Sequence, residues 1–180
     1  ACDLGKSGGK FFYKLLNGQT HALWMDAEVA QRSAAGVAQV SSGGRPQDNA
    51  WIRLRDHLVF VRKAAQAFLD CNSFKEDKSL KAAERIAGVL GAIAKIESLP
   101  SEFEAIVWVL LPINELATRQ KISSRLTEIC QGFCFQDATE CRIDLKLSFR
   151  PEGYGIYVQR KCQLQQMGVA ITQRTTWIEM

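Results

Sequence analysis

Apolar and polar positions near the start of the chain alternate with the two-residue period of β-strands. Two such runs, 11–16 and 19–25, flank the pair Asn17-Gly18. This pair favours a type I′ hairpin turn, because both residues accept a positive φ. The next stretch, 27–40, mixes helix-favouring alanines with Gly36 and is ambiguous, whereas 41–49 has the Ser, Gly and Pro content of a loop. We therefore expect an N-terminal hairpin followed by a loop.

Spacings of three and four residues predict helices in the middle of the chain. The first helix is expected from Ala50 to about Cys71, with these apolar side chains on one face: Trp51, Leu54, Leu58, Val61, Ala65 and Phe68. A second helix is expected from Leu80 to the stop at Leu99-Pro100. Its small residues form a flat stripe that suits close packing against another helix, namely Ala83, Ala87 and Gly91.

Two further helical segments are expected before the C-terminal third. Ser101 and Glu104 have the spacing of a capping box ahead of an apolar run, and Pro112 would end that helix. Apolar residues at helical spacing then predict a segment that stops near Gly132, namely Ile122, Leu126 and Ile129. The middle of the chain is thus expected to form three to four helices.

The last part of the chain again has the period of strands. Apolar and polar residues alternate strictly over 141–149, and Arg150-Pro-Glu-Gly153 has the composition of a turn. Strands are expected at 154–164 and from 169 to about 178. The expected fold class is α+β, in which the N-terminal hairpin and a C-terminal three-stranded meander form an antiparallel sheet against a layer of helices.

Six cysteines carry most of the candidate chemistry. If Phe149 pairs with Tyr154 across the turn, the register places Cys141 opposite Cys162, where β-carbons are about 4.5 to 5.5 Å apart. We therefore predict a disulfide between these two residues. The pairing of the other cysteines, Cys71, Cys130 and Cys134, stays open. Their spacing lacks the short Cys-x2-Cys pairs of zinc knuckles, so no metal site is expected.

Other candidate chemistry is weak. His57 follows Asp56 directly, and consecutive helical positions do not face each other, so no nucleophile, base and orienting group are apparent. The segments Gly-Lys-Ser at 5–7 and Gly-Gly-Lys at 8–10 resemble pieces of a phosphate loop, but they lack its full spacing and a preceding buried strand. We expect no catalytic residue, no cofactor and no small-molecule substrate.

Composition is that of an ordinary globular domain. The chain has 180 residues, is 47% hydrophobic and carries a net charge of +4. This length suits one domain, and the dispersed Lys and Arg argue against a nucleic-acid surface. The longest apolar run, 105–113, is about half of what spans a bilayer. We expect residues 11–180 to form a single α+β domain.

The first ten residues give the one resemblance to a known class of protein. Cys2 follows a small residue and precedes a polar, Gly-rich segment. This resembles the mature N-terminus of a bacterial lipoprotein, which implies lipid attachment at Cys2, a flexible tether over 1–10 and a location in the periplasm or on the outer face of a membrane. The rival interpretation is an unmodified thiol after a residue introduced by cloning.

These observations favour a non-catalytic protein. We expect a cell-envelope lipoprotein that serves as an accessory or structural subunit, or as an inhibitor or immunity protein. The alternatives are a cytoplasmic regulatory or nucleic-acid-binding domain, and an enzyme with a scattered site. Aromatic and basic side chains on the predicted C-terminal sheet are expected to bind a protein partner, namely Tyr154, Tyr157, Arg160, Arg174 and Trp177. Together with Lys161, the residues Tyr154, Tyr157, Arg160 and Arg174 form an aromatic and basic strip, which is the one feature of the sequence that favours nucleic-acid binding.

Overall fold

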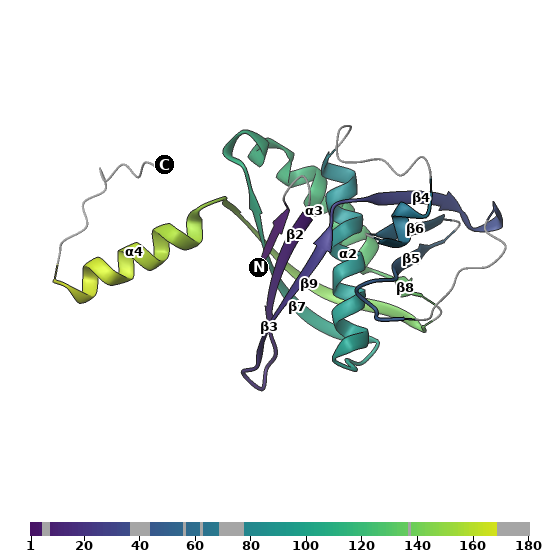
Figure 1. The fold of residues 1–180 in the computed structure, drawn as a ribbon, viewed down its shortest axis with the longest axis horizontal. Coiled ribbons are helices and arrows are strands. Elements are labelled where there is room, and N and C mark those ends of the chain that lie inside the picture. The colour runs from purple at the N-terminus through teal and green to yellow at the C-terminus, as the bar shows by residue number, and fades with distance from the viewer. Residues whose placement is uncertain are drawn as a thin grey trace.

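A computed structural model describes residues 1–4, 8–36, 44–55, 57–61, 63–68, 78–136 and 138–168. The strands of this part of the chain form one nine-stranded sheet in the order β3-β2-β1-β7-β9-β8-β5-β6-β4 (Figure 1). Their bounds are β1 Cys2–Leu4, β2 Gly8–Lys14, β3 Thr20–Asp26, β4 Val29–Ser33, β5 Ala50–Leu54, β6 His57–Val61, β7 Glu102–Leu111, β8 Phe133–Phe135 and β9 Glu140–Pro151. The helices are α1 Lys63–Gln66, α2 Lys78–Ile96, α3 Arg119–Cys130 and α4 Tyr154–Gln166, with 3-10 turns η1 Ala34–Gly36 and η2 Ile113–Thr118.

The sheet curls around α2. Strands β3 and β4 lie at opposite ends of the strand order, although only Ala27 and Glu28 separate them in sequence. A two-residue link spans only about 10 Å, so the two edges of the sheet must approach each other. In Figure 1, α2 lies between the β2–β3 hairpin on one side and β5 and β6 on the other. This enclosure buries α2 continuously from Ala82 to Ile93.

The predicted N-terminal hairpin is confirmed, but with a different turn. β2 and β3 pair antiparallel from Gly8–Asp26 to Lys14–Thr20. The Gly18 amide donates to the carbonyl of Leu15, and Gly18 alone among the turn residues has a positive φ, 89°. The loop is therefore a turn centred on Leu16 and Asn17 with a left-handed glycine, rather than the expected type I′ turn.

The predicted helix from Ala50 to Cys71 is wrong. Residues 50–61 form the antiparallel pair β5 and β6, joined at Arg55 with a positive φ, and only the short α1 follows. Both faces of these strands are buried, so their apolar residues run consecutively and produce three- and four-residue spacings by chance. Asp56 and the segment 69–77, with Cys71, lie outside the described residues.

The predicted helix after Ser101 is also wrong. Residues 102–111 form β7, which pairs in parallel with β9 along its whole length. Exposed Glu102 and Glu104 alternate with half-buried Phe103 and Ala105, and this two-residue period outweighs the capping-box signal. Pro112 does end the element, as expected.

The two other predicted helices are confirmed as α2 and α3. The small residues of α2 face strands as well as a helix. A Cβ at Gly88 would come within 2.8 Å of Val61, and one at Gly91 within 2.5 Å of Phe135. These contacts explain why the helix needs glycine on its strand-facing side.

At the C-terminal end, the predicted strand 141–149 is confirmed as β9, but 154–166 is helix α4 rather than a strand. β9 ends at Pro151, and Gly153, with a φ of 79°, is the capping residue directly before α4. The expected strand over 169–178 lies outside the described residues. The fold class is confirmed as mixed α and β, but the sheet is large and contains parallel strands instead of a small antiparallel meander. None of the helices in the described residues is long and apolar enough to cross a membrane.

Candidate functional site

The carboxyl ends of three parallel strands meet at one edge of the sheet. β1 pairs in parallel with β7, and β7 with β9. These strands end at Leu4, Leu111 and Pro151, and the last two are register partners. The loops that follow such ends form the usual ligand crevice of open sheets with parallel strands. The β1–β2 link at this edge is Gly5-Lys6-Ser7, which lies outside the described residues.

Charged side chains line the last outward-facing row of this edge. The register aligns Trp24, Lys10, Asp3, Leu110 and Arg150 across five strands. Lys10 is directly opposite Asp3, and its ammonium lies 5.4 Å from the centre of the Trp24 ring. The guanidinium of Arg150 lies 5.3 Å from Trp108 and 5.5 Å from Tyr154. Two cations therefore flank the one carboxylate of this row.

Close packing restricts the start of β2 to glycine. A Cβ at Gly8 would come within 2.8 Å of the Trp24 ring, and one at Gly9 within 2.5 Å of Arg85 Nη2 and 2.7 Å of the Phe11 ring. Both glycines are buried and pair with Asp26 and Met25 of β3, so the start of β2 is held inside the sheet. The edge thus combines a glycine-rich backbone with nearby Lys and Arg.

A buried arginine lies beneath this backbone. Arg85 of α2 has 0% of its surface exposed and donates a hydrogen bond from Nη2 to the carbonyl oxygen of Met25, at 2.9 Å. Burial lowers its pKa to about 10, and the carboxylates of Glu28, Asp26 and Asp3 act in the opposite direction. A pKa of about 10 keeps this guanidinium charged at neutral pH. The region therefore has a permanent positive charge inside the fold.

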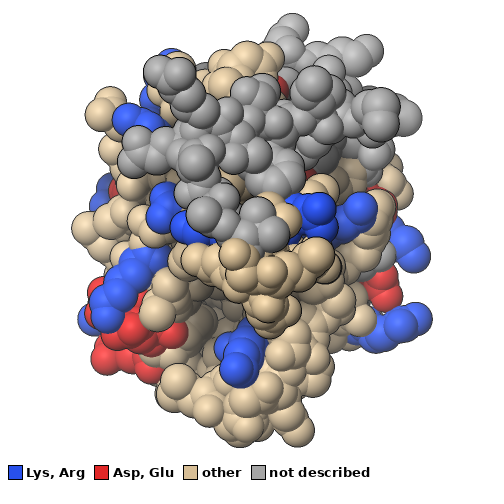
Figure 2. Space-filling view, turned by 90° about the vertical axis from the view of Figure 1, so that its left-hand side faces the viewer, with Lys and Arg blue, Asp and Glu red and all other residues tan. Residues whose placement is uncertain are grey.

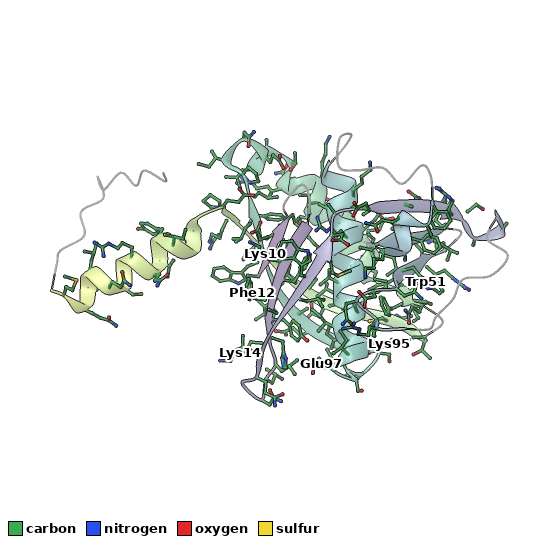
Figure 3. All side chains as sticks on the ribbon, viewed as in Figure 1. Lys10, Phe12, Lys14, Trp51, Lys95 and Glu97 are labelled. Carbon is green, nitrogen blue, oxygen red and sulfur yellow. The ribbon has the colours of Figure 1, made fainter. Side chains whose placement is uncertain are left out.

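The outer face of the same strands carries exposed apolar side chains. Lys10, Phe12 and Lys14 follow one another along β2 and point away from α2 (Figure 3). The exposed large apolar residues of this face are Phe12, Trp24, Ile106 and Trp108. Figure 2 views the side from which α4 projects, and there Lys and Arg side chains are scattered while Asp and Glu gather toward the edges. The two-residue alternation of exposed and less exposed positions in β7 could have indicated this face. We did not recognise it, because we assigned the segment to a helix.

The residues that we predicted to bind a partner do not share a sheet. Tyr154, Tyr157 and Arg160 lie on α4, where the two tyrosine rings are 6.1 Å apart. Arg174 and Trp177 lie outside the described residues. The expected sheet surface is therefore corrected to a helix, and its role in partner binding stays a prediction.

The cysteines are free thiols where the structure describes them. The predicted disulfide is wrong, because Cys141 is buried on β9 whereas Cys162 is exposed on α4, which is not a strand facing it. Cys2 lies in β1, not in a tether, and burial raises its pKa to about 11. Residues 8–10 also lie in a strand. No group of three or more His, Cys, Asp or Glu among the described residues is placed to hold a metal ion.

Alkylation should separate these thiols clearly. Iodoacetamide reacts with thiolates, and burial raises the pKa of Cys130 to about 12 and that of Cys141 to about 11, so these two and Cys2 should resist labelling in the folded protein. Among the cysteines that the structure describes, exposed Cys162 should be labelled first. Peptide mass mapping over time checks this order, and labelling in denaturant is the control for intrinsic reactivity. Early labelling of Cys141 would contradict the described burial.

The segment 5–10 was not retained as a candidate in the sequence analysis, because its structural setting could not be seen there. We set it aside for want of a preceding buried strand, yet β1 precedes it and Cys2 is buried there. β1 has only three residues, too few for a periodic signal. The useful signal was the density of Gly and Lys directly after an acidic residue, Asp3.

No protein-family model matches the sequence, and no curated protein is similar to it. Solved structures do match in fold. An archaeal actin homologue, Ta0583, is 16% identical over 96% of this chain and 49% of its own, with a TM-score of 0.60. AlfA from a Bacillus subtilis plasmid, solved as a filament, is 15% identical over 86% of this chain and 55% of its own, with a TM-score of 0.59. Bacillus thuringiensis ParM with ATP is 12% identical over 84% of this chain and 44% of its own, with a TM-score of 0.55.

These matches correct several expectations. A non-catalytic envelope lipoprotein or inhibitor is wrong, because the shared fold is that of actin-like and filament proteins. The expectation that the protein is not an enzyme is corrected by the likeness to ParM solved with ATP. The expected periplasmic or lipid-anchored location is corrected as well, because the chain shares its fold with AlfA, a filament protein from a plasmid. The chain spans about half the length of these structures, and the part it covers has the fold of an actin homologue.

Proposed function

We propose that this chain binds the phosphates of ATP at the edge formed by the carboxyl ends of β1, β7 and β9. The observation that carries this proposal is the convergence of these three ends at one edge; in the sequence, the β1–β2 link Gly5-Lys6-Ser7 leads from there to Gly8, Gly9 and Lys10 of β2. Backbone amides of such links bind phosphate oxygens, and nearby cations neutralise their charge. The likeness to ParM with ATP supports the same ligand.

The residues present suit a polyphosphate. Gly8 and Gly9 are buried and have neighbours that a Cβ would strike, so the start of β2 is held close to the core at this edge. Lys10 and Arg150 supply positive charge in the same row, and Asp3 supplies a carboxylate for a magnesium ion that accompanies the nucleotide. Because the chain spans about half of its structural matches, we propose that it forms one wall of the site.

Replacing Lys10 with methionine should weaken ATP binding about tenfold or more. A hydrogen bond to a charged group contributes about 1.5 to 3 kcal/mol, and 1.4 kcal/mol corresponds to about tenfold in affinity. Titration calorimetry with Mg-ATP measures the effect. Lys14→Met is the matched control, since Lys14 lies on the same face of β2 and about 13 Å farther from the link. Equal losses in both variants, or no binding by the unaltered protein, would refute the proposal.

Assembly into filaments is a second candidate function. AlfA was solved as a filament, and the outer face here exposes Phe12, Trp24 and Trp108. Apolar patches of this kind mark interaction surfaces. Sedimentation with and without Mg-ATP tests whether the protein self-associates. The predicted partner-binding residues of α4, Tyr154, Tyr157 and Arg160, are candidates for the same role.

A further inference from the structure

In the part of the chain that the structure describes, the outer face of β1, β2 and β7 lacks the helical cover that the inner face has. Buried residues on the inner face of these strands pack with α2 and α3 in the main core. The helix α1 contacts β4, β5 and β6 instead, and α4 projects away from the sheet (Figure 1). Parallel strands, such as β1 with β7 and β7 with β9, are usually covered on both faces. One face of these strands is thus left without the layer that parallel pairing favours.

Large apolar side chains occupy this uncovered face. Phe12 of β2 and Trp108 of β7 lie in the row next to the one that contains Lys10, and Ile106 lies one row farther. Ile106 is 64% exposed, although β7 has a paired strand on each side. Single exposed apolar residues are common, whereas a contiguous group marks an interaction surface. The outer face therefore has the composition of a binding surface.

The width of this surface suits one helix. Phe12 on β2 and Trp108 on β7 are separated by β1 alone, so their backbones are about 10 Å apart. Between them, β1 places only Asp3 and the small residue Ala1 on this face. An α-helix with its side chains has a diameter of about 10 to 12 Å. A helix that lies along β1 would therefore contact the aromatic residues on both sides.

The charge around the apolar rows is positive. The cations that border these rows are Lys10, Lys14 and Arg150. Asp3 is the one acidic residue in the three described rows, and Lys146 of β9 is already paired with a glutamate of β7 at 2.8 Å. An apolar centre with a charged border is typical of protein interfaces. The sign of this border calls for a partner with acidic side chains.

Two other occupants fit this surface less well. A second copy laid face to face would bring like charges together, and α4 of a second copy carries Arg160 and Lys161 but no acidic residue. Single-stranded nucleic acid binds by stacking its bases on aromatic rings. Here the rings of Trp24 and Trp108 are already contacted by cations, and Ile106 offers no ring. Charge and side-chain type together favour an acidic protein segment.

We propose that the outer face of β1, β2 and β7 binds an amphipathic helix with acidic flanks, supplied by a partner protein. The apolar stripe of this helix covers Phe12, Ile106 and Trp108, and its carboxylates pair with the bordering cations. The bound helix forms the second layer over the parallel strands. This inference goes beyond ATP binding, and Ile106 and Lys14 take no part in the proposed phosphate site.

The test uses two synthetic helical peptides as probes. Both carry leucine along one helical face, and the other positions are mostly glutamate in one peptide and mostly lysine in the other. Fluorescence anisotropy of the labelled peptides measures their binding to the full chain. The glutamate peptide should bind, with an affinity that falls as salt is raised. The lysine peptide should bind about tenfold more weakly or less.

Ile106→Asp should lower the affinity for the glutamate peptide about tenfold or more, because it places a repelling charge in the apolar contact. The matched control is Ile156→Asp, since Ile156 of α4 is 66% exposed but does not lie on the sheet. The control should keep the unaltered affinity. Lys14→Glu is a second variant on the outer face and should also weaken binding. Melting curves followed by circular dichroism show whether each variant is folded.

The proposal is wrong if the unaltered chain does not bind the glutamate peptide at about 1 mM, or binds both peptides equally. It is also wrong if folded Ile106→Asp or Lys14→Glu binds the glutamate peptide as tightly as the unaltered protein. Sedimentation equilibrium and binding of a labelled single-stranded oligonucleotide are measured on the same variants. If Ile106→Asp changes one of these but not peptide binding, the face contacts a second copy or a nucleic acid instead. ATP affinity should be the same in all these variants.

Discussion

Replacing Trp51 with alanine is expected to lower the free energy of unfolding by about 3 to 5 kcal/mol. Trp51 lies on β5 with 0% of its surface exposed, in a small core with Leu58, Phe60 and Ala65. Its ring centre is 6.3 Å from that of Phe60. Truncation removes the buried ring and leaves a cavity that the two flanking strands cannot fill. Urea denaturation followed by circular dichroism measures the loss.

The matched control is Trp24→Ala. Trp24 is 51% exposed on the outer face of β3 and interacts with the Lys10 ammonium. An exposed cation–π contact contributes about 0.5 to 1 kcal/mol, so the control should lose about 1 kcal/mol. Similar losses in the two variants would mean that Trp51 is not in a core between strands.

Replacing Arg125 with methionine should lower the free energy of unfolding by about 3 kcal/mol at neutral pH. Glu84 lies on the enclosed helix α2 with 7% of its side chain exposed, and Arg125 is its ion-pair partner at 3.2 Å. Removing the cation leaves a buried carboxylate without its ion-pair partner. For a chain of this size the melting temperature should fall by about 6 to 12 °C, which differential scanning calorimetry measures.

The pH dependence of this variant has a definite sign. Burial raises the pKa of Glu84 above its usual value, and Arg125 opposes this, so removing Arg125 raises the pKa further. A carboxyl group with a raised pKa binds its proton more tightly in the folded state, so stability is lost as pH rises through the folded pKa. The deficit of Arg125→Met should therefore shrink as pH falls from 7 toward 5. The double variant with Glu84→Gln should recover most of the stability and lose this pH dependence.

Sequence patterns were reliable where one face of an element meets water. The alternation of Ile143 and Leu145 with charged residues in β9, and the apolar periodicity of α3, were predicted and confirmed. The hairpin of β2 and β3 was predicted from the same kind of signal. In each case one face of the element is exposed to solvent and carries polar residues. Apolar residues then recur at every second position in a strand and at spacings of three and four in a helix, so the period identifies the element.

The same reasoning failed where both faces of a strand are buried. In β5 and β6, Ile52 and Val59 belong to the main core while Trp51 and Phe60 belong to the smaller one. No face is left for polar residues, and consecutive apolar residues fit a helix as well as a strand. In α4 the error was the reverse, because Tyr154 to Gln166 makes few contacts and neither face imposes a pattern.

The candidate site depended on pairing that no local pattern reveals. Asp3 and Arg150 are 147 residues apart in the sequence, yet the parallel pairing of β1, β7 and β9 places them in one row with Lys10. Arg85 reaches the Met25 carbonyl of β3 only because the sheet curls around α2. Long-range strand order is set by how the whole set of apolar faces is buried together, which a single sequence does not state.

By itself, the sequence determined the mixed α and β class, the N-terminal hairpin, the helices α2 and α3 and the strand β9, because each has a periodic pattern or a stop residue within its own length. The tertiary structure alone decided that 50–61 and 102–111 are strands, that Cys141 and Cys162 lie on different elements, and that a row of charged residues and a buried arginine lie at one edge of the sheet. The physical reason is that local patterns record which faces are buried, whereas strand order and burial on both faces arise only when distant segments pack together.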